Sequence, residues 1–290
     1  QVGKSTNTSD VSIDSAITIN GPITVYGGVI NVDANLASTA TTGDGVVIEG
    51  QRILQDNGVD TTTQGADISY TAANFLSTAD SESLIVINGS GANRSILNAS
   101  GGDITINSSF GGTSTEGGAD RAISFITADL ITSGSGSISL TGDATNNTNS
   151  SSTAWGMQPD DTTIQTVSGD ITLDMTGGKS SSNSRGLALD SQSIQLLSSS
   201  GAITVRDIQP TGLTGNYYGL YLSPSSANAI LFGANGTTVP SSSSNVVIEA
   251  DKAAFVNQPI LFNTSGTVTV RPAGASFSSS LDTTLLNIAS

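Results

Sequence analysis

Short apolar bursts alternate with small polar residues along the whole chain, and five of them share one pattern. Each begins with Gly and one variable residue, and continues with an apolar residue, Thr or Ser, and a second apolar residue. The copies are Gly102–Ile106, Gly136–Leu140, Gly169–Leu173, Gly201–Val205 and Gly266–Val270. Apolar and polar residues alternating at a period of two are typical of a strand with one buried face. We therefore predict a strand at each copy.

The five copies recur at a nearly constant interval. Their glycines are 34, 33, 32 and 65 residues apart, and the last interval is close to twice the others. The copy missing near residue 233 is predicted to be degenerate, at Ala229–Gly233 or at Gly236–Val239. A fixed repeat of about this length is the sequence signature of a solenoid.

Two further apolar bursts follow the first in each repeat, as in Gly186–Leu189 and then Ser193–Leu196. Three short strands with one apolar face cannot bury that face alone, so the repeats must stack and share a core. The sequence therefore predicts an all-β fold, a parallel β-helix with three short strands per coil. Residues at the same repeat position are expected to form an interior column: Ile104, Ile138, Ile171, Ile203 and Val268.

The first hundred residues contain the same kind of short alternating apolar bursts, but at less regular intervals. Strands are predicted at Val11–Ile13, Ala16–Ile19, Pro22–Val25 and Val29–Val32, joined by minimal corners. No linker or change of composition divides the chain. We predict one solenoid over 1–290 with roughly ten coils, less regular over 1–100 and with coils of about 33 residues over 101–290. Extended loops, such as 141–161 and 175–186, are expected along one edge.

Composition and charge exclude several classes of function. The chain has no His and no Cys, which excludes Ser-His-Asp and Cys-His catalysis and the usual zinc sites. The net charge of −15 opposes binding to phosphate backbones, so nucleic acid is not an expected partner. No stretch approaches the roughly 18 apolar residues of a membrane span, so we expect no membrane insertion.

Three segments carry a resemblance to a known family. Gly169–Gly178, Gly201–Val205 and Gly215–Leu222 resemble the strand repeats of filamentous-haemagglutinin-like adhesins and other large bacterial surface proteins. The resemblance extends over residues 102–290 and more loosely over the start. It implies a secreted or surface-attached β-helical shaft from a Gram-negative bacterium, located outside the cell or on its surface.

Asp160 and Asp161 form the best candidate pair of catalytic carboxylates, because glycosidases use two carboxylates as acid and base. They are predicted to lie in a loop, and the nearest basic residues along the chain, Lys179 and Arg185, belong to another coil. The alternative is a solvated turn after Pro159.

Asp103, Asp170 and Asp174 are the candidates for calcium binding, the only cofactor expected to be possible. Asp103 and Asp170 share a repeat position, and stacked carboxylates offer the hard oxygen ligands that calcium prefers. The alternative is that these side chains accept hydrogen bonds from backbone N–H groups in turns.

Trp155, Tyr217, Tyr218 and Tyr221 are the aromatic residues expected to emerge from loops, where they could stack on sugar rings or anchor a protein. The alternative for Trp155 is packing inside a wide coil. The expected function is structural and not enzymatic: a rigid rod for adhesion, a surface layer or a fibre. Its expected partners are other copies, end to end or laterally, and glycans or proteins of a host or cell surface. The alternative is a polysaccharide-cleaving β-helix enzyme.

Overall fold

The structure is a computed structural model of the 290-residue chain. It describes residues 1–75, 82–112, 119–147, 153–179, 183–190, 193–207, 216–224, 230–257, 260–274 and 286–289. These residues form 28 strands and no helix, so the described part of the chain contains no helix able to cross a membrane. The strands form three sheets, which we name A, B and C.

Each sheet is a stack of parallel strands. Sheet A contains β3 (Ile23–Tyr26), β6 (Asp44–Gly50), β9 (Asp67–Phe75), β12 (Ile104–Phe110), β15 (Ile138–Asp143), β18 (Ile171–Thr176), β21 (Ile203–Asp207), β24 (Val246–Ala250) and β27 (Val268–Arg271). Sheet B contains β1 (Val11–Ile13), β4 (Val29–Val32), β7 (Arg52–Gln55), β10 (Ser83–Asn88), β13 (Ala119–Ile126), β16 (Thr153–Asp160), β19 (Asn183–Asp190), β22 (Asn216–Ser223) and β25 (Ala253–Phe255). Sheet C contains β2 (Ile17–Ile19), β5 (Leu36–Ser38), β8 (Asp60–Thr63), β11 (Ser95–Asn98), β14 (Ala128–Ile131), β17 (Thr162–Gln165), β20 (Ile194–Leu197), β23 (Ile230–Gly233), β26 (Ile260–Asn263) and β28 (Leu286–Ala289).

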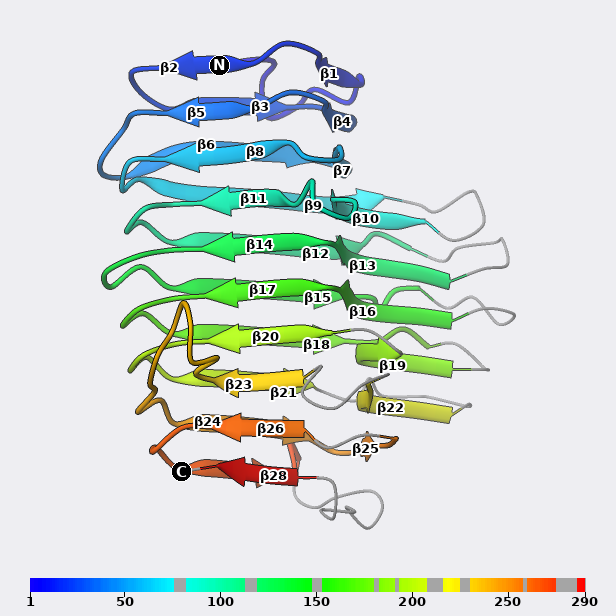
Figure 1. Cartoon of the computed structure of the whole chain (residues 1–290). Helices are drawn as coiled ribbons and strands as arrows, with labels where there is room; N and C mark the ends of the chain where they lie inside the picture. The colour runs from blue at the N-terminus through cyan, green and yellow to red at the C-terminus, as the bar shows by residue number, and fades with distance from the viewer. Residues whose placement is uncertain are drawn as a thin grey trace.

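From β1 to β27 the chain visits sheets B, C and A in turn, so each strand pairs with the strand three places earlier (Figure 1). This arrangement confirms the predicted parallel β-helix with three strands per coil. The predicted interior column of Ile104, Ile138, Ile171, Ile203 and Val268 lies in one register in sheet A. Four further residues belong to it: Ile23, Val46 and Ile68 before Ile104, and Val246 between Ile203 and Val268.

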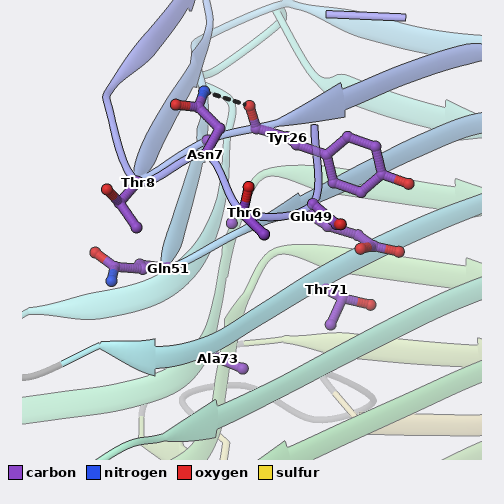
Figure 2. A pocket seen from close by; sticks show the side chains of 11 residues that line it. Thr6, Asn7, Thr8, Tyr26, Glu49, Gln51, Thr71 and Ala73 are labelled. Atoms are coloured by element: carbon purple, nitrogen blue, oxygen red, sulfur yellow. Dashed lines mark hydrogen bonds between the residues drawn. The ribbon is translucent and has the colours of Figure 1, made fainter. Parts of the chain in front are cut away.

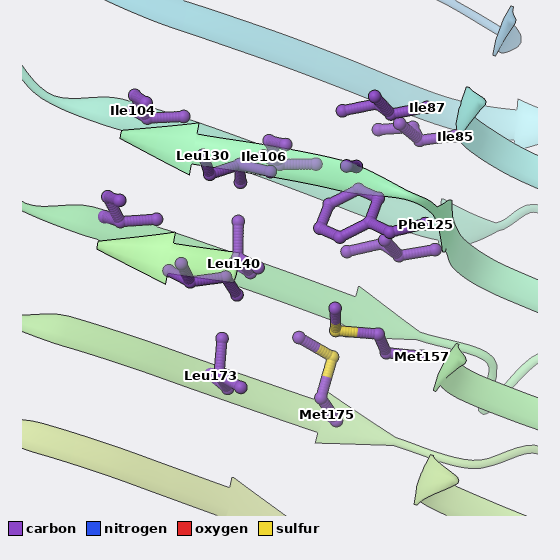
Figure 3. Close-up of a cluster of buried hydrophobic side chains, with 14 of the residues drawn as sticks. Ile85, Ile87, Ile104, Ile106, Phe125, Leu130, Leu140, Met157, Leu173 and Met175 are labelled. Carbon is purple, nitrogen blue, oxygen red and sulfur yellow. The ribbon is translucent and has the colours of Figure 1, made fainter. Parts of the chain in front are cut away.

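The core is one continuous cluster that extends along the stack. Figure 3 shows its central part, where Leu140, Leu173, Phe125 and Met157 from sheets A and B meet between coils. All four side chains are fully buried. Because such sites relax only partly, shortening a fully buried Ile such as Ile171 to Ala costs about 2–5 kcal/mol.

The glycine that opens each predicted repeat lies at the corner where the chain passes from sheet C to sheet A. A Cβ added at Gly169 would lie 1.9 Å from the carbonyl oxygen of Gly136, and a Cβ at Gly201 would lie 1.9 Å from that of Gly169. Successive coils therefore stack backbone on backbone here. A buried hydroxyl three residues earlier, as in Thr166, donates a hydrogen bond of 2.7 Å to the carbonyl of Gly169.

The prediction for the missing copy is wrong. Ile230–Gly233 is β23 of sheet C, and Val239 packs beside Leu197 and Leu231 in a small second cluster. The true copy is β24, in which Val246 pairs with Ile203. An insertion before β24 lengthens the coil between β21 and β24, and the coil between β24 and β27 is short. The two differences cancel, so the interval from Gly201 to Gly266 still equals about two repeats.

The N-terminal end of the stack leaves apolar side chains open to solvent. Val2 forms a parallel bridge to Val25, with its N–H donating to the carbonyl of Thr24 at 2.8 Å. This bridge covers the first strand of sheet A only. Val2 and Ile19 remain 43% and 39% exposed, and Val11 and Ile17 are only partly buried.

Candidate functional site

Cations and aromatic rings alternate on four successive strands of sheet B and at the residue before a fifth strand. We name this set the cation–aromatic ladder: Arg121, Trp155, Arg185, Tyr218 with Tyr221, and Lys252. The residues Arg121, Trp155, Arg185 and Tyr218 pair in register on β13, β16, β19 and β22. Lys252 immediately precedes β25. The ladder lies outside the hydrophobic core cluster.

Each neighbouring pair in the ladder is in contact. The guanidinium carbon of Arg121 lies 5.1 Å from the centroid of the Trp155 ring, and that of Arg185 lies 5.4 Å from it on the next strand. Arg185 is also 3.7 Å from the centroid of the Tyr221 ring. Cations placed over ring faces in this way are attracted by the ring quadrupole.

The ladder ends in a pair of tyrosines and a lysine. The rings of Tyr218 and Tyr221 meet edge to face, with centroids 5.8 Å apart and planes at 68°. The ammonium of Lys252 lies 4.2 Å from the centroid of Tyr218. Tyr221 pairs with Ala188 and Ala254 on the neighbouring strands.

The residue after each of Trp155, Arg185 and Tyr218 is a glycine on the inner side of its strand. Gly156, Gly186 and Gly219 follow Trp155, Arg185 and Tyr218 directly. A Cβ at Gly186 would lie 1.7 Å from Oδ1 of Asp207, and one at Gly219 would lie 1.9 Å from Oδ2, so these glycines face sheet A. Successive residues of a strand point to opposite faces. The residue before each glycine therefore points away from the core.

Two of the ladder's cations have no carboxylate partner in the described part of the chain. Arg121 donates to Oε1 of Gln158 and, at 2.9 Å, to the carbonyl of Ala119, but neither it nor Lys252 forms an ion pair there. Burial lowers the pKa of Arg121, and the nearby Asp120 carboxylate opposes this shift. Arg121 and Lys252 therefore keep positive charge that no direct ion pair neutralises among the described residues.

Other arginines are neutralised by cross-strand ion pairs. Arg52 pairs with Glu82 at 3.4 Å. On the outer face of sheet A, Asp174, Arg206, Glu249 and Arg271 occupy consecutive strands and alternate in sign. Asp174, a candidate calcium ligand, therefore faces Arg206, with 3.7 Å between Oδ2 and Nη1.

The other two calcium candidates accept hydrogen bonds from the next coil. Oδ1 of Asp103 accepts from the N–H of Ser137 at 2.8 Å, and Oδ1 of Asp170 accepts from the N–H of Ala202 at 2.7 Å. Among the described residues, no group of three or more Asp or Glu is placed to hold a metal ion. The calcium prediction thus has no preformed site in that part of the chain.

Asp160 and Asp161 occupy different surroundings from those predicted. Asp160 is the last residue of β16, not part of a loop, and Asp161 lies at the corner after it with φ of 45°. The basic residue beside them is Arg94, not Lys179 or Arg185. Its Nη1 lies 2.7 Å from Oδ2 of Asp161, and its Nε and Nη2 each lie 2.8 Å from Asp129.

The two carboxylates therefore differ in chemistry. Asp161 is tied into an ionic cluster, whereas burial, with the neighbouring charge of Asp161, raises the pKa of Asp160. A shallow depression on sheet B is lined by Asp160, Gln158 and Arg121. It places a carboxyl group at the margin of the cation–aromatic ladder.

The prediction that the four aromatic residues emerge from loops is wrong, because Trp155 lies in β16 and the three tyrosines lie in β22, and Trp155 and Tyr217 are buried. Tyr217 is 2% exposed, lies in β22, and donates a hydrogen bond of 2.6 Å from its hydroxyl to Oδ1 of Asp207. Tyr218 and Tyr221 are half-buried on the outer face, and Trp155 is 8% exposed between two guanidiniums. Of the four aromatic candidates, three thus belong to one site.

A polar depression of about 290 Å³ lies at the other end of the molecule (Figure 2). Asn7 closes one side by donating a hydrogen bond of 2.9 Å from Nδ2 to the carbonyl of Tyr26, and Glu49 and Thr71 line the floor. It contains no cluster of aromatic rings or cations. We therefore place the candidate site at the cation–aromatic ladder.

The cations of the ladder were not predicted as binding residues. Their signal in the sequence is the residue before the second burst of each repeat, which is Arg, Trp, Arg or Tyr and is followed by Ala or Gly. It is visible in Arg121-Ala122, Trp155-Gly156, Arg185-Gly186 and Tyr218-Gly219. Lys252 is aligned one position later, beside Gly219, because Ala253 pairs with Leu220.

Comparison of the chain with protein-family models, with curated proteins and with solved structures finds no match.

Proposed function

We propose that this chain is a rigid, non-enzymatic shaft of a secreted or cell-surface bacterial protein, serving adhesion, a surface layer or an extracellular fibre. The observation that supports this proposal is the main core cluster, which is continuous from Ile13 near the start to Phe262 in β26. No coil is independent of its neighbours. The resemblance of residues 102–290 to the repeats of large bacterial adhesins favours the same function.

Stiffness is the mechanical property that this arrangement supports. Three sheets surround the core, and each strand between the two ends is paired on both sides. Bending the stack would stretch the backbone hydrogen bonds between paired strands in at least one sheet. Ten strands in sheet C, at a spacing of about 4.8 Å, give a length of about 43 Å.

Association end to end fits the shaft. Sheets end in strands with unpaired N–H and C=O groups, which are templates for pairing with another chain. At the N-terminal end, β1 and β2 are the first strands of sheets B and C, and Val2 and Ile19 add exposed apolar surface. A contact between unlike ends repeats into a filament.

Negative-stain imaging of the full chain tests the proposal. We expect straight rods of uniform width at low concentration, and rods of greater length as the concentration rises. Ile19→Lys removes apolar surface from one end only and should reduce the lengthening without changing the width. Compact particles, or rods that bend freely, would contradict the shaft.

A further inference from the structure

The cation–aromatic ladder has a regular spacing along the axis of the stack. Neighbouring strands in a sheet are about 4.8 Å apart, so Arg121, Arg185 and Lys252, two strands apart, follow one another at about 9.6 Å. The rings on β16 and β22 are spaced in the same way and lie between the cations. A ligand that matches this face must be linear and must alternate negatively charged groups with groups that pack on aromatic rings.

The ladder retains groups that can bind such a ligand. Stacking uses the face of a guanidinium and leaves its N–H donors in the plane, where they suit a carboxylate. Arg121 uses Nε and Nη1 for Gln158 and Ala119, and Nη2 has no partner among the described residues. The rings of Tyr218 and Tyr221 are half-buried, so part of each ring is open to solvent.

We propose that this face of sheet B binds a linear acidic polysaccharide with one carboxylate in each disaccharide, lying along the axis of the stack. The carboxylates are bound by Arg121 and Lys252, near the two ends of this face. Arg185, which is 9% exposed between the rings of Trp155 and Tyr221, adds positive charge beneath the ligand, and the intervening sugars pack on Tyr218 and Tyr221. This inference rests on the proposed shaft, because only a rigid stack keeps the five strands at a fixed spacing.

Charge and shape favour a polysaccharide over other acidic polymers. Double-stranded nucleic acid has about one charge per 1.7 Å of its axis, which is far denser than cations placed about 9.6 Å apart. A peptide of acidic residues alone, such as polyglutamate, would match the cations but has no apolar ring face to pack on the tyrosines. A polymer of alternating acidic and neutral sugars supplies both features in the order in which the ladder presents them.

Fluorescence gives a direct measurement, since Trp155 is the only tryptophan in the chain. We expect hyaluronate oligosaccharides of ten sugars to change the emission of the full chain saturably, and added salt to weaken the binding. Arg121→Gln and Lys252→Gln should each weaken it about tenfold, the equivalent of one charge-assisted contact. Tyr221→Leu should weaken it by several-fold.

Arg271→Gln is the matched control, because it removes the same charge from the outer face of sheet A and should leave hyaluronate affinity within twofold. Circular dichroism of each variant verifies folding. Absence of hyaluronate binding, equal affinity of the Arg121→Gln/Lys252→Gln double variant, or equal binding of neutral chitin oligosaccharides would overturn the proposal. Equally strong binding of polyglutamate would also overturn it, in favour of an acidic peptide.

The failure of this proposal can be distinguished from failure of the shaft. Straight rods in negative stain without hyaluronate binding would contradict the polysaccharide-binding proposal and leave the proposed shaft standing. Freely bending particles would remove the shaft whatever the fluorescence showed.

Discussion

Tyr217 and Asp207 form a buried polar pair at the bend between sheets A and B. Asp207 is 1% exposed, accepts the hydroxyl hydrogen bond of Tyr217 on Oδ1, and has no partner on Oδ2. Burial raises the pKa of Asp207 well above its usual range, the hydrogen bond from Tyr217 opposes the shift, and the charges of Asp251 and Asp174 add to it. The folded state therefore binds a proton at Asp207 more tightly than the unfolded state.

Stability should consequently depend on pH through this one carboxyl group. An unfolded Asp titrates near pH 3.9, so the contribution of Asp207 is largest below about pH 4 and is lost as pH rises toward the folded pKa. Asp207→Asn keeps the shape and cannot ionise. We expect this variant to gain melting temperature over the natural chain as pH rises from about 4 to 8.

Thermal unfolding followed by circular dichroism across that pH range provides the test. Asp44→Asn is the control, since it removes one negative charge from an exposed position in β6. A constant difference between Asp207→Asn and the natural chain at every pH would show that Asp207 ionises alike in both states.

The glycines that open the repeats form a column at the corner between sheets C and A, where each strand of sheet A begins. Its members admit no side chain because each lies against the backbone of the preceding coil. Gly169→Ala would force two coils apart, and overpacking of this kind costs about 1–3 kcal/mol. We expect a lower midpoint in urea with an unchanged slope.

Gly274→Ala is a suitable comparison for that measurement. Its added Cβ would meet only the Asp251 side chain, at 3.1 Å, so the neighbour can move aside. We expect a change within about 0.5 kcal/mol. A loss at Gly274 as large as at Gly169 would attribute the effect to glycine in general and not to the stacked backbones.

The regular columns could be predicted from the sequence because alternation and interval are both visible in it. Ile104, Ile138 and Ile171 needed no knowledge of the corners. The copy containing Val246 could not be placed from the sequence. The intervals on its two sides are 43 and 22 residues, and their mean is close to the regular repeat length.

The site was predictable in residue type but not in orientation. Tyr217 and Tyr218 are adjacent, and Tyr217 donates to the buried Asp207 whereas Tyr218 contacts Lys252 outside the core. A strict alternation would place Tyr218 on the same face as Leu220, whereas Leu220 is in the core and Tyr218 is not. The alternation therefore breaks at Gly219, and the carboxylate of Asp207, the last residue of β21, lies against this glycine.

At the scale of the whole molecule, stability is a sum of coils and of contacts between them. Coils at an end have one neighbour and inner coils have two. We expect hydrogen exchange to be faster in β1, β2 and β5 than in β14, β17 and β20, because the end coils open with less loss of contact.

Mass spectrometry of exchanged peptic fragments measures this gradient. Ile171→Ala, in the middle of the stack, should raise exchange in β15 and β21 more than in β1. Equal protection along the entire chain would instead indicate that the stack unfolds only as a single unit.

The irregular coils have a consequence for how such a chain can change. The segment between β23 and β24 adds residues that pack over the outer face of sheet C, and β24 still pairs with β21 in the same register. The number of residues in the segment that connects two strands can therefore change without altering the register in which those strands pair. Foreign sequence could be grafted at residues 235–238, and surfaces could diversify there over generations, while the underlying lattice of strands stays constant.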